Sequence, residues 1–116
     1  MTHYMHLNGT PFAKIKSKEK TVELRLYDEK RQKVSIGDVI VFDNLSEPGG
    51  TISARVTDIQ RFDNFDTLYK FLPLQNCGYS DDEVKTANPD DMLEYYSKEE
   101  QQKYGVVGIE IELCEA

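Results

Sequence analysis

Hydrophobic and polar residues alternate along several short segments of the chain, which is the pattern of β-strands that bury one face. The alternation is clearest around residues 22–27, where we predict a strand. Successive side chains of a strand point to opposite faces, so this segment presents an apolar face to the core and a polar face away from it. The apolar residues are Val22, Leu24 and Leu26, and the polar residues are Thr21, Glu23 and Arg25. We take this polar row as the centre of a candidate site.

The same pattern predicts four further strands. Residues 3–7, 52–56 and 107–113 alternate, and residues 39–42 form a continuous apolar run of strand length. Ile59 breaks the alternation that precedes it, which predicts a bulge or the end of a strand.

Helix start and stop signals lie between these strands. Thr10 is a suitable N-cap and Pro11 a suitable first residue for a helix that runs to about Ser17. Asn64 can cap a second helix, which Pro73 ends. Further short helices are predicted to begin at Ser80, Asn88 and Ser97, and Gly105 is the natural stop of the last one.

The order of these elements indicates the fold class. A strand and a helix are followed by three strands, two or three short helices and a final strand. This order is typical of an α+β fold, with a small mixed sheet or partly closed barrel and helices over one side or one mouth. Since the chain has 116 residues and no repeat or linker, we predict a single domain over residues 1–116.

Charge is distributed unevenly along the chain. The net charge is −7, which argues against a protein that binds nucleic acid through a long basic groove. Residues 14–33, however, hold eight basic and four acidic residues. A local basic strip on an acidic body favours a small anion, a nucleotide or a short nucleic-acid segment as the ligand.

Other features bound the environment of the protein. No apolar run approaches membrane-spanning length and the N-terminus has no signal pattern, so we expect a cytoplasmic protein without a membrane partner. Cys77 and Cys114 are too few for a disulfide framework and are expected to be free thiols. His3 and His6 point to opposite faces of their strand, so we predict no metal site, and nothing in the sequence calls for a cofactor.

Three stretches of the sequence resemble the ASCH domain family, specifically its small single-domain bacterial members. The first is residues 20–25, with the sequence KTVELR, in which a lysine, a glutamate and an arginine are spaced as in that family. The second is residues 36–42, IGDVIVF, a glycine–aspartate turn followed by an apolar strand. The third is YYSKEE at residues 95–100, leading to YGVVGI at residues 104–109.

The resemblance implies a PUA-like pseudo-barrel with a cleft that binds RNA or a nucleotide, in a protein of RNA metabolism. It implies that Lys20, Glu23 and Arg25 line that cleft. Related small proteins are acetylcytidine amidohydrolases, which this chain resembles at Lys20, Thr21 and Arg25. Glu23 stands where those enzymes have a second threonine as the nucleophile. Other members of the family are linked to RNA cleavage.

The chemistry of each residue supports more than one role. The Arg25 guanidinium can hold a phosphate bidentately or can form a surface ion pair with Glu23. Arg25 should keep Glu23 ionised, as an acceptor for a base edge or a ribose hydroxyl. Lys20, with Lys18 beside it, can clamp a phosphate or act as a general base. Thr21 is the one hydroxyl of the row, either a nucleophile or a structural residue.

Aromatic residues near the C-terminus are candidates for a stacking wall. Tyr95, Tyr96 and Tyr104 could stack on a base, although aromatic residues at helical spacing more often pack in the core. We expect one of the three to face the cleft. Ser97 offers a hydroxyl to the ligand or caps a helix.

Three functions therefore remain open from the sequence. The first is a module that binds RNA or a nucleotide. The second is a hydrolase that acts on a modified nucleoside or on RNA phosphodiesters, with Lys20, Thr21 and Glu23 as its candidate catalytic residues. The third is a protein-interaction domain that uses its acidic C-terminal half.

Overall fold

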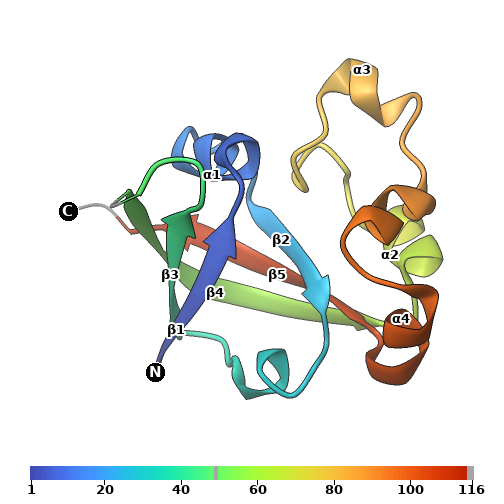
Figure 1. Cartoon of the computed structure of the whole chain (residues 1–116), viewed down its shortest axis with the longest axis horizontal. Helices are drawn as coiled ribbons and strands as arrows, with labels where there is room; N and C mark the ends of the chain where they lie inside the picture. The colour runs from blue at the N-terminus through green and yellow to red at the C-terminus, as the bar shows by residue number, and fades with distance from the viewer. Residues whose placement is uncertain (49, 115–116) are drawn as a thin grey trace.

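A computed structural model describes residues 1–48 and 50–114 of the chain. All five predicted strands are present, and the fold is α+β (Figure 1). The strands are β1 (Thr2–Leu7), β2 (Val22–Leu26), β3 (Val39–Asn44), β4 (Thr51–Phe62) and β5 (Val106–Leu113). The helices are α1 (Gly9–Lys16), η1 (Arg31–Lys33), α2 (Phe65–Phe71), α3 (Asp81–Val84), η2 (Pro89–Glu94) and α4 (Lys98–Tyr104), where η marks a 3₁₀-helix.

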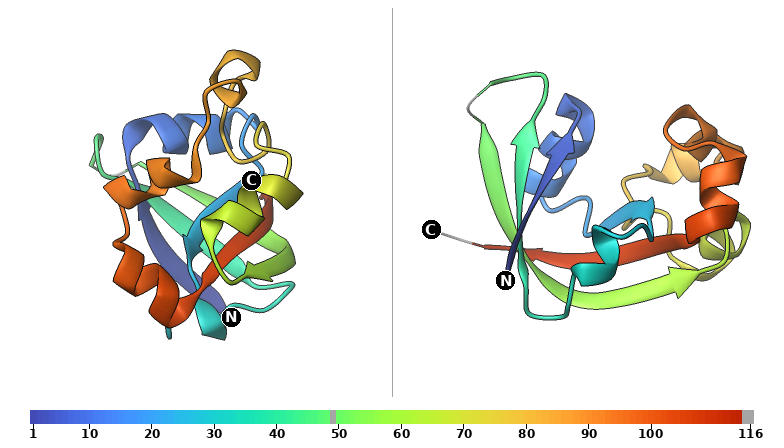
Figure 2. Two further views of the ribbon diagram at one scale, coloured as in Figure 1. Left: turned by 90° about the vertical axis from the view of Figure 1, so that its right-hand side faces the viewer. Right: turned by 60° about the horizontal axis from the view of Figure 1, so that its bottom comes forward.

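The five strands form one curled sheet in the order β1-β3-β4-β5-β2. β1 and β3 are parallel and the other neighbouring pairs are antiparallel, so the predicted mixed sheet is confirmed. The sheet curls into a half-barrel, and the segment between β4 and β5 carries α2, α3, η2 and α4 to one side of it (Figure 2). The predicted pseudo-barrel with short helices over one side is therefore the observed architecture.

β4 is longer than the sequence predicts. It continues through Ile59 to Phe62, and its register with β5 shifts between Val56 and Asp58. The break in alternation at Ile59 thus marks a bulge within the strand and not its end. A bulge increases the local twist and bends the strand. Because of this bend, β4 and β5 form part of the half-barrel and also extend to the helical segment at one side of it.

Helix caps largely follow the sequence signals. The Asn64 side chain accepts a hydrogen bond from the Thr67 N–H, and Ser80 and Ser97 form capping boxes with Glu83 and Glu100. The start of α1 differs from the prediction, because the helix begins at Gly9 and its N-cap is Asn8, with no side-chain cap. Thr10 is consequently inside the first turn.

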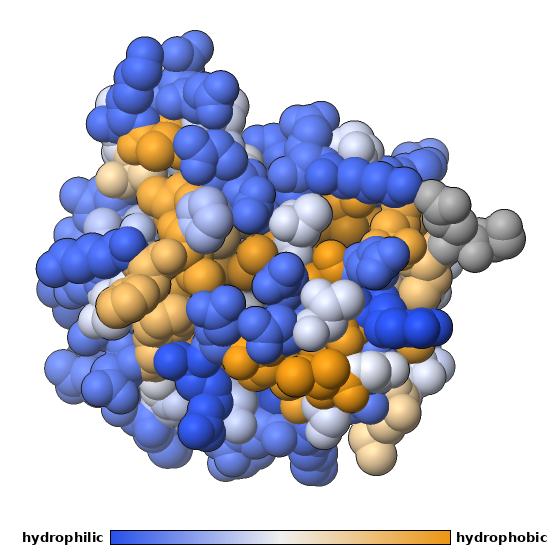
Figure 3. All heavy atoms as spheres, turned by 180° about the vertical axis from the view of Figure 1, so that it is seen from behind, coloured by the Kyte–Doolittle hydropathy of each residue, from blue (hydrophilic) through white to orange (hydrophobic). Residues whose placement is uncertain are grey.

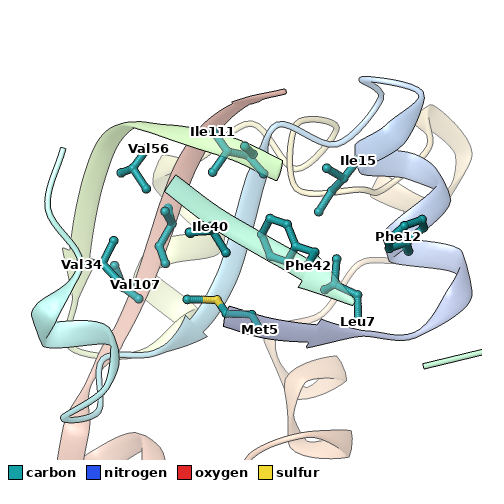
Figure 4. Packing of buried hydrophobic residues seen from close by; sticks show 12 residues of the cluster. Met5, Leu7, Phe12, Ile15, Val34, Ile40, Phe42, Val56, Val107 and Ile111 are labelled. Atoms are coloured by element: carbon teal, nitrogen blue, oxygen red, sulfur yellow. The ribbon is translucent and has the colours of Figure 1, made fainter. Parts of the chain in front are cut away.

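Two apolar clusters form the core. The barrel cluster fills the curl of the sheet and is covered by α1 (Figure 4). It consists of Met5, Leu7, Phe12, Ile15, Val34, Ile40, Phe42, Ala54, Val56, Val107, Ile109 and Ile111. The helix cluster lies between β2 and the helices of the inserted segment. It consists of Val22, Leu24, Leu26, Phe65, Leu68, Leu72, Cys77, Met92 and Val106.

The two clusters explain the alternation in β2. Its apolar residues are buried, as predicted, but they pack against the helices and belong to the helix cluster. Its polar residues Glu23 and Arg25 alternate with them, on the face of β2 away from the helix cluster. A strand between two packed bodies can present a polar row to a hollow without exposing its apolar face.

When the molecule is viewed from behind, hydrophobic residues form a broken band across the middle of the surface, with hydrophilic residues around and between them (Figure 3). Within the described part of the chain, every helix is too short or too polar to traverse a bilayer.

The close approach of β5 to α2 provides a test of the helix cluster. A Cβ atom at Gly108 would lie 2.7 Å from Leu72 Cδ1 and 3.3 Å from Val22 Cγ1. We expect Gly108→Ala to lower the free energy of unfolding by about 1–3 kcal/mol, because the added methyl group overpacks this contact. Urea denaturation monitored by circular dichroism measures the change. The control is Gly50→Ala, where the nearest atom is 3.4 Å away, and a loss as large as at Gly108 would contradict this account.

Candidate functional site

A cleft with a volume of about 570 Å³ lies between the half-barrel and the helical side. Its floor comes from β2, including Glu23 and Arg25. One wall comes from the end of β1 and from α1, including Lys14. The opposite wall comes from the segment before α3, from α3 itself and from η2. In the cartoon, α3 stands away from α1 on the other side of β2 (Figure 1). The cleft therefore exists because α3 and η2 stand away from α1 across β2.

Glu23 is the central residue of the floor. Its side chain is only 3% exposed, and each carboxylate oxygen contacts one cation. Lys20 Nζ lies 2.7 Å from Oε1, and Arg25 Nε lies 2.8 Å from Oε2. Burial raises the pKa of Glu23, but the attraction of Lys20 and Arg25 outweighs it, so the net pKa is below the ordinary value. Glu23 is thus an ionised carboxylate that holds two cations at the floor of the cleft.

Arg25 also connects the two edges of the sheet. Its Nη2 donates a hydrogen bond to the His6 carbonyl of β1 at 2.8 Å. Nearby, Lys30 Nζ donates to the Tyr4 carbonyl at 2.7 Å. Side chains therefore satisfy acceptors of an edge strand that has no backbone partner on that side. Burial opposes the charged form of Arg25, but Glu23 and Tyr96 favour it and raise its pKa above the usual value.

Lys20 is positioned by backbone contacts on both sides of the cleft. Its N–H donates to the Lys14 carbonyl at 3.0 Å, and the next two N–H groups, of Thr21 and Val22, both donate to the Asn76 carbonyl. A Cβ atom at Gly78 would lie 3.2 Å from Lys20 Cδ, so glycine allows the chain to pass close to this side chain. The irregular segment around residues 74–79 thereby packs directly against the floor.

Lys14 is a third cation in the cleft, in addition to the candidate site residues identified from the sequence. Its Nζ donates to the Gly78 carbonyl and lies 3.5 Å from Glu83 Oε1, so it links α1 to the opposite wall. Only its place in the basic strip of residues 14–33 pointed to this role. Lys14 lies within the helix that the sequence predicts up to about Ser17, but the residues on the other side of the cleft are distant in sequence.

Thr21 and Lys18 lie away from this cleft. They line a second hollow with Ile15, Ile111 and Leu113, which Lys20 also borders. Strand parity placed Thr21 beside Glu23, but β2 begins at Val22, and Thr21 takes part in backbone hydrogen bonds to Asn76 and Ile111. The structure therefore brings Lys20, Glu23 and Arg25 together in one cleft, but Thr21 and Lys18 are separated from Glu23 and Arg25.

The tyrosines divide between the cleft and the core. Tyr95 is 54% exposed and lines the cleft. Tyr96 also lines it, and its ring stacks on Phe65 with centroids 6.3 Å apart. Tyr104 packs against the helix cluster and is not among the cleft residues. The Ser97 hydroxyl caps α4 by accepting from the Glu100 N–H at 3.1 Å.

Several further groups line the cleft, and none of them is an activated nucleophile. Cys77 is buried, and burial raises the pKa of its thiol to about 11, so it is protonated at neutral pH. Burial also raises the pKa of Tyr79, whose hydroxyl contacts the Tyr69 hydroxyl and donates a hydrogen bond to the Asp91 carboxylate. His6 pairs with Asp43 at 3.3 Å on the rim. Across residues 1–48 and 50–114, no group of three or more His, Cys, Asp or Glu side chains is arranged to hold a metal ion.

Comparison with known proteins identifies the family. The model of the ASCH domain matches residues 5–115. The solved structure of the hypothetical protein PH0355 has 32% sequence identity and a TM-score of 0.79, covering 98% of this chain and all of that one. Protein PF0455 from Pyrococcus furiosus has 35% identity and a TM-score of 0.72, with both chains covered completely. No curated protein matches the sequence.

The curled sheet with its helical insertion is the ASCH fold. The ASCH protein from Zymomonas mobilis has the same fold, with a TM-score of 0.63 at 15% identity over 96% of this chain and 66% of that one. Together with the match over residues 5–115, these similarities show that the chain belongs to the ASCH domain family.

The buried ion pairs predict a pH-dependent loss of stability. At pH 7 we expect Glu23→Gln to lower the free energy of unfolding by about 3 kcal/mol, because it leaves two largely buried cations unpaired. The pKa of Glu23 is lowered by folding, so the unfolded state binds its proton first as the pH falls below about 4.5. The wild type therefore loses this stabilisation in acid, and the difference in the free energy of unfolding between wild type and Glu23→Gln should become smaller.

Urea denaturation at pH 7 and at pH 3.5 measures both differences. The matched control is Glu110→Gln, which removes an exposed carboxylate of β5 and should change the free energy of unfolding by less than about 0.5 kcal/mol. A gap between wild type and Glu23→Gln that is the same at both pH values would contradict the ionised state of Glu23.

Proposed function

We propose that the protein binds RNA or a nucleotide in the cleft above β2 and acts in RNA metabolism. ASCH domains generally bind RNA. The observation that carries the proposal is the pair of cations, Lys20 and Arg25, held on one buried carboxylate at the floor of a cleft. Both cations keep donors beyond those that Glu23 accepts, and donors oriented in advance bind a phosphate at a lower entropic cost.

For Glu23 we propose a role different from direct contact with the ligand. Because both of its oxygens already contact cations, it is best suited to orient Lys20 and Arg25, and less suited to contact a base or ribose directly. Tyr95, exposed on the wall, is the residue best placed to stack on a base.

The charges of the cleft favour a short ligand. Its lining holds three cations and four carboxylates, a net charge of −1 with His6 neutral. A surface that follows many phosphates needs an excess of basic residues along its length. This cleft offers a cationic floor large enough for one phosphate, so we propose that one nucleotide of a single strand, or a free nucleotide, occupies it.

The hydrolase alternative has less support from the geometry. Thr21 lines a hollow different from the one that Glu23 and Arg25 line. Glu23 has a lowered pKa, which makes it a weak general base at neutral pH. Incubation with acylated cytidines and with single-stranded RNA tests this alternative directly, and turnover abolished by Lys20→Ala would favour it over simple binding.

The cations of the floor provide the main test of binding. We expect Lys20→Ala and Arg25→Ala each to weaken binding of a fluorescently labelled single-stranded RNA hexamer by about tenfold or more, because each removes charge-assisted hydrogen bonds worth about 1.5–3 kcal/mol. Fluorescence anisotropy at about 150 mM salt measures the affinity, and thermal melting checks that each variant is folded.

The control for this experiment is Lys16→Ala. Lys16 is exposed on α1 and does not line the cleft, yet its removal changes the net charge by the same amount. We expect less than a twofold change. Equal affinities for wild type, Lys20→Ala and Arg25→Ala would end the assignment of these two residues to ligand binding.

Stacking gives an independent prediction. We expect Tyr95→Ala to weaken binding of the same hexamer by about 1–3 kcal/mol, since a base that stacks on an aromatic ring gains about that much. Tyr4→Ala is the matched control, because Tyr4 is 62% exposed and lies outside the cleft. If both variants bind as the wild type does, Tyr95 is not the stacking residue.

A further inference from the structure

The wall of the cleft opposite Lys14 presents two carboxylates from η2. Asp91 and Glu94 both line the cleft. They are three residues apart on a 3₁₀-helix, which has three residues per turn, so their side chains lie one above the other on the same side of η2. This arrangement explains why both reach the same cleft.

Asp91 is held in place by its neighbours. Its Oδ2 accepts hydrogen bonds from the Asn88 N–H at 3.1 Å and from the Tyr79 hydroxyl at 3.2 Å. The Tyr79 hydroxyl in turn contacts that of Tyr69 at 2.5 Å. No hydrogen bond from a described residue reaches Oδ1 of Asp91. One oxygen of an oriented carboxylate is therefore left to accept a hydrogen bond from a ligand.

Glu94 is accessible in the same way. Its side chain is exposed, and it forms no hydrogen bond or ion pair within the described part of the chain. The next residue is Tyr95, the exposed aromatic of the cleft. A base stacked on Tyr95 would have its edge close to the carboxylates of η2.

Opposite charges thus face each other across the cleft. The floor carries a net +1 from Lys20, Arg25 and Glu23, and η2 carries −2 from Asp91 and Glu94. A nucleotide has the matching polarity, with an anionic phosphate at one end and hydrogen-bond donors on the base at the other. Carboxylates are suited to accept from the amino group of a base, as they do from cytosine N4.

We propose that Asp91 and Glu94 read the base of the bound nucleotide and favour bases that carry an exocyclic amino group over uracil. Uracil has a carbonyl oxygen where cytosine has its amino group, and two carboxylates repel that oxygen. This proposal rests on the proposed function, because it concerns the same cleft, but it assigns specificity to residues other than the phosphate-binding cations.

The test compares two labelled RNA hexamers, hexacytidylate and hexauridylate, by fluorescence anisotropy at neutral pH and about 150 mM salt. They differ at the amino group and the adjacent ring nitrogen, while the backbone charge is the same. We expect the wild type to bind hexacytidylate about tenfold more tightly. Glu94→Gln should reduce that ratio at least threefold, because the neutral amide accepts more weakly and can donate to the uracil carbonyl.

Two further variants make the result decisive. Asp91→Asn should also reduce the ratio, and Glu94→Gln keeps the test valid if the loss of the Asp91 cap unfolds η2. Glu110→Gln removes an exposed carboxylate of β5 outside the cleft and should leave the ratio unchanged.

The possible outcomes separate the two proposals. Wild type that binds both hexamers equally well would overturn base reading by η2 and leave the proposed function standing. Wild type that binds neither hexamer, and neither free CMP nor free UMP, would overturn both. A ratio unchanged in Glu94→Gln and Asp91→Asn, or lowered equally by Glu110→Gln, would show that these two carboxylates do not discriminate between bases.

Discussion

The structure depends on one buried carboxylate between two cations. A charge removed from water is tolerated only when it is paired and hydrogen-bonded, and Glu23 meets that condition with Lys20 on one oxygen and Arg25 on the other. These contacts also hold separate parts of the fold together. Arg25 reaches the backbone of β1, and Lys20 packs beside the segment that leads to α3. The same charge that is expensive to bury therefore orders the floor of the cleft.

The cleft follows from the way in which the sheet curls without closing. β1 and β2 are its two edges, and the Arg25 side chain connects them where a closed barrel would have a backbone ladder. β2 keeps its apolar face against the helix cluster and its polar face towards the opening. Because the helical segment packs on the apolar face, it stands apart from α1, and the space between them becomes a site.

The sequence predicted those features of the fold that depend on residues close together in the chain. The alternation at β2, the capping boxes of Ser80 and Ser97, and the irregularity at Ile59 are properties of a few neighbouring residues, and the structure retains them. The features that the sequence did not predict depend on tertiary contacts. The alternation of polar and apolar residues placed Thr21 in the polar row. In the structure, its backbone hydrogen bonds with Asn76 and Ile111 hold it beside the second hollow.

The wall of the cleft was the least predictable part for the same reason. Residues 74–79 have no periodicity, yet this segment supplies Cys77, Gly78 and Tyr79 to the site. Asp91 lies in the first turn of η2 and caps it through one oxygen, while the other oxygen remains available. A residue can cap a helix and also contact a ligand. The sequence pattern that predicts the cap gives no sign of the contact. Polar side chains that cap short helices beside a cavity therefore merit examination as ligand contacts.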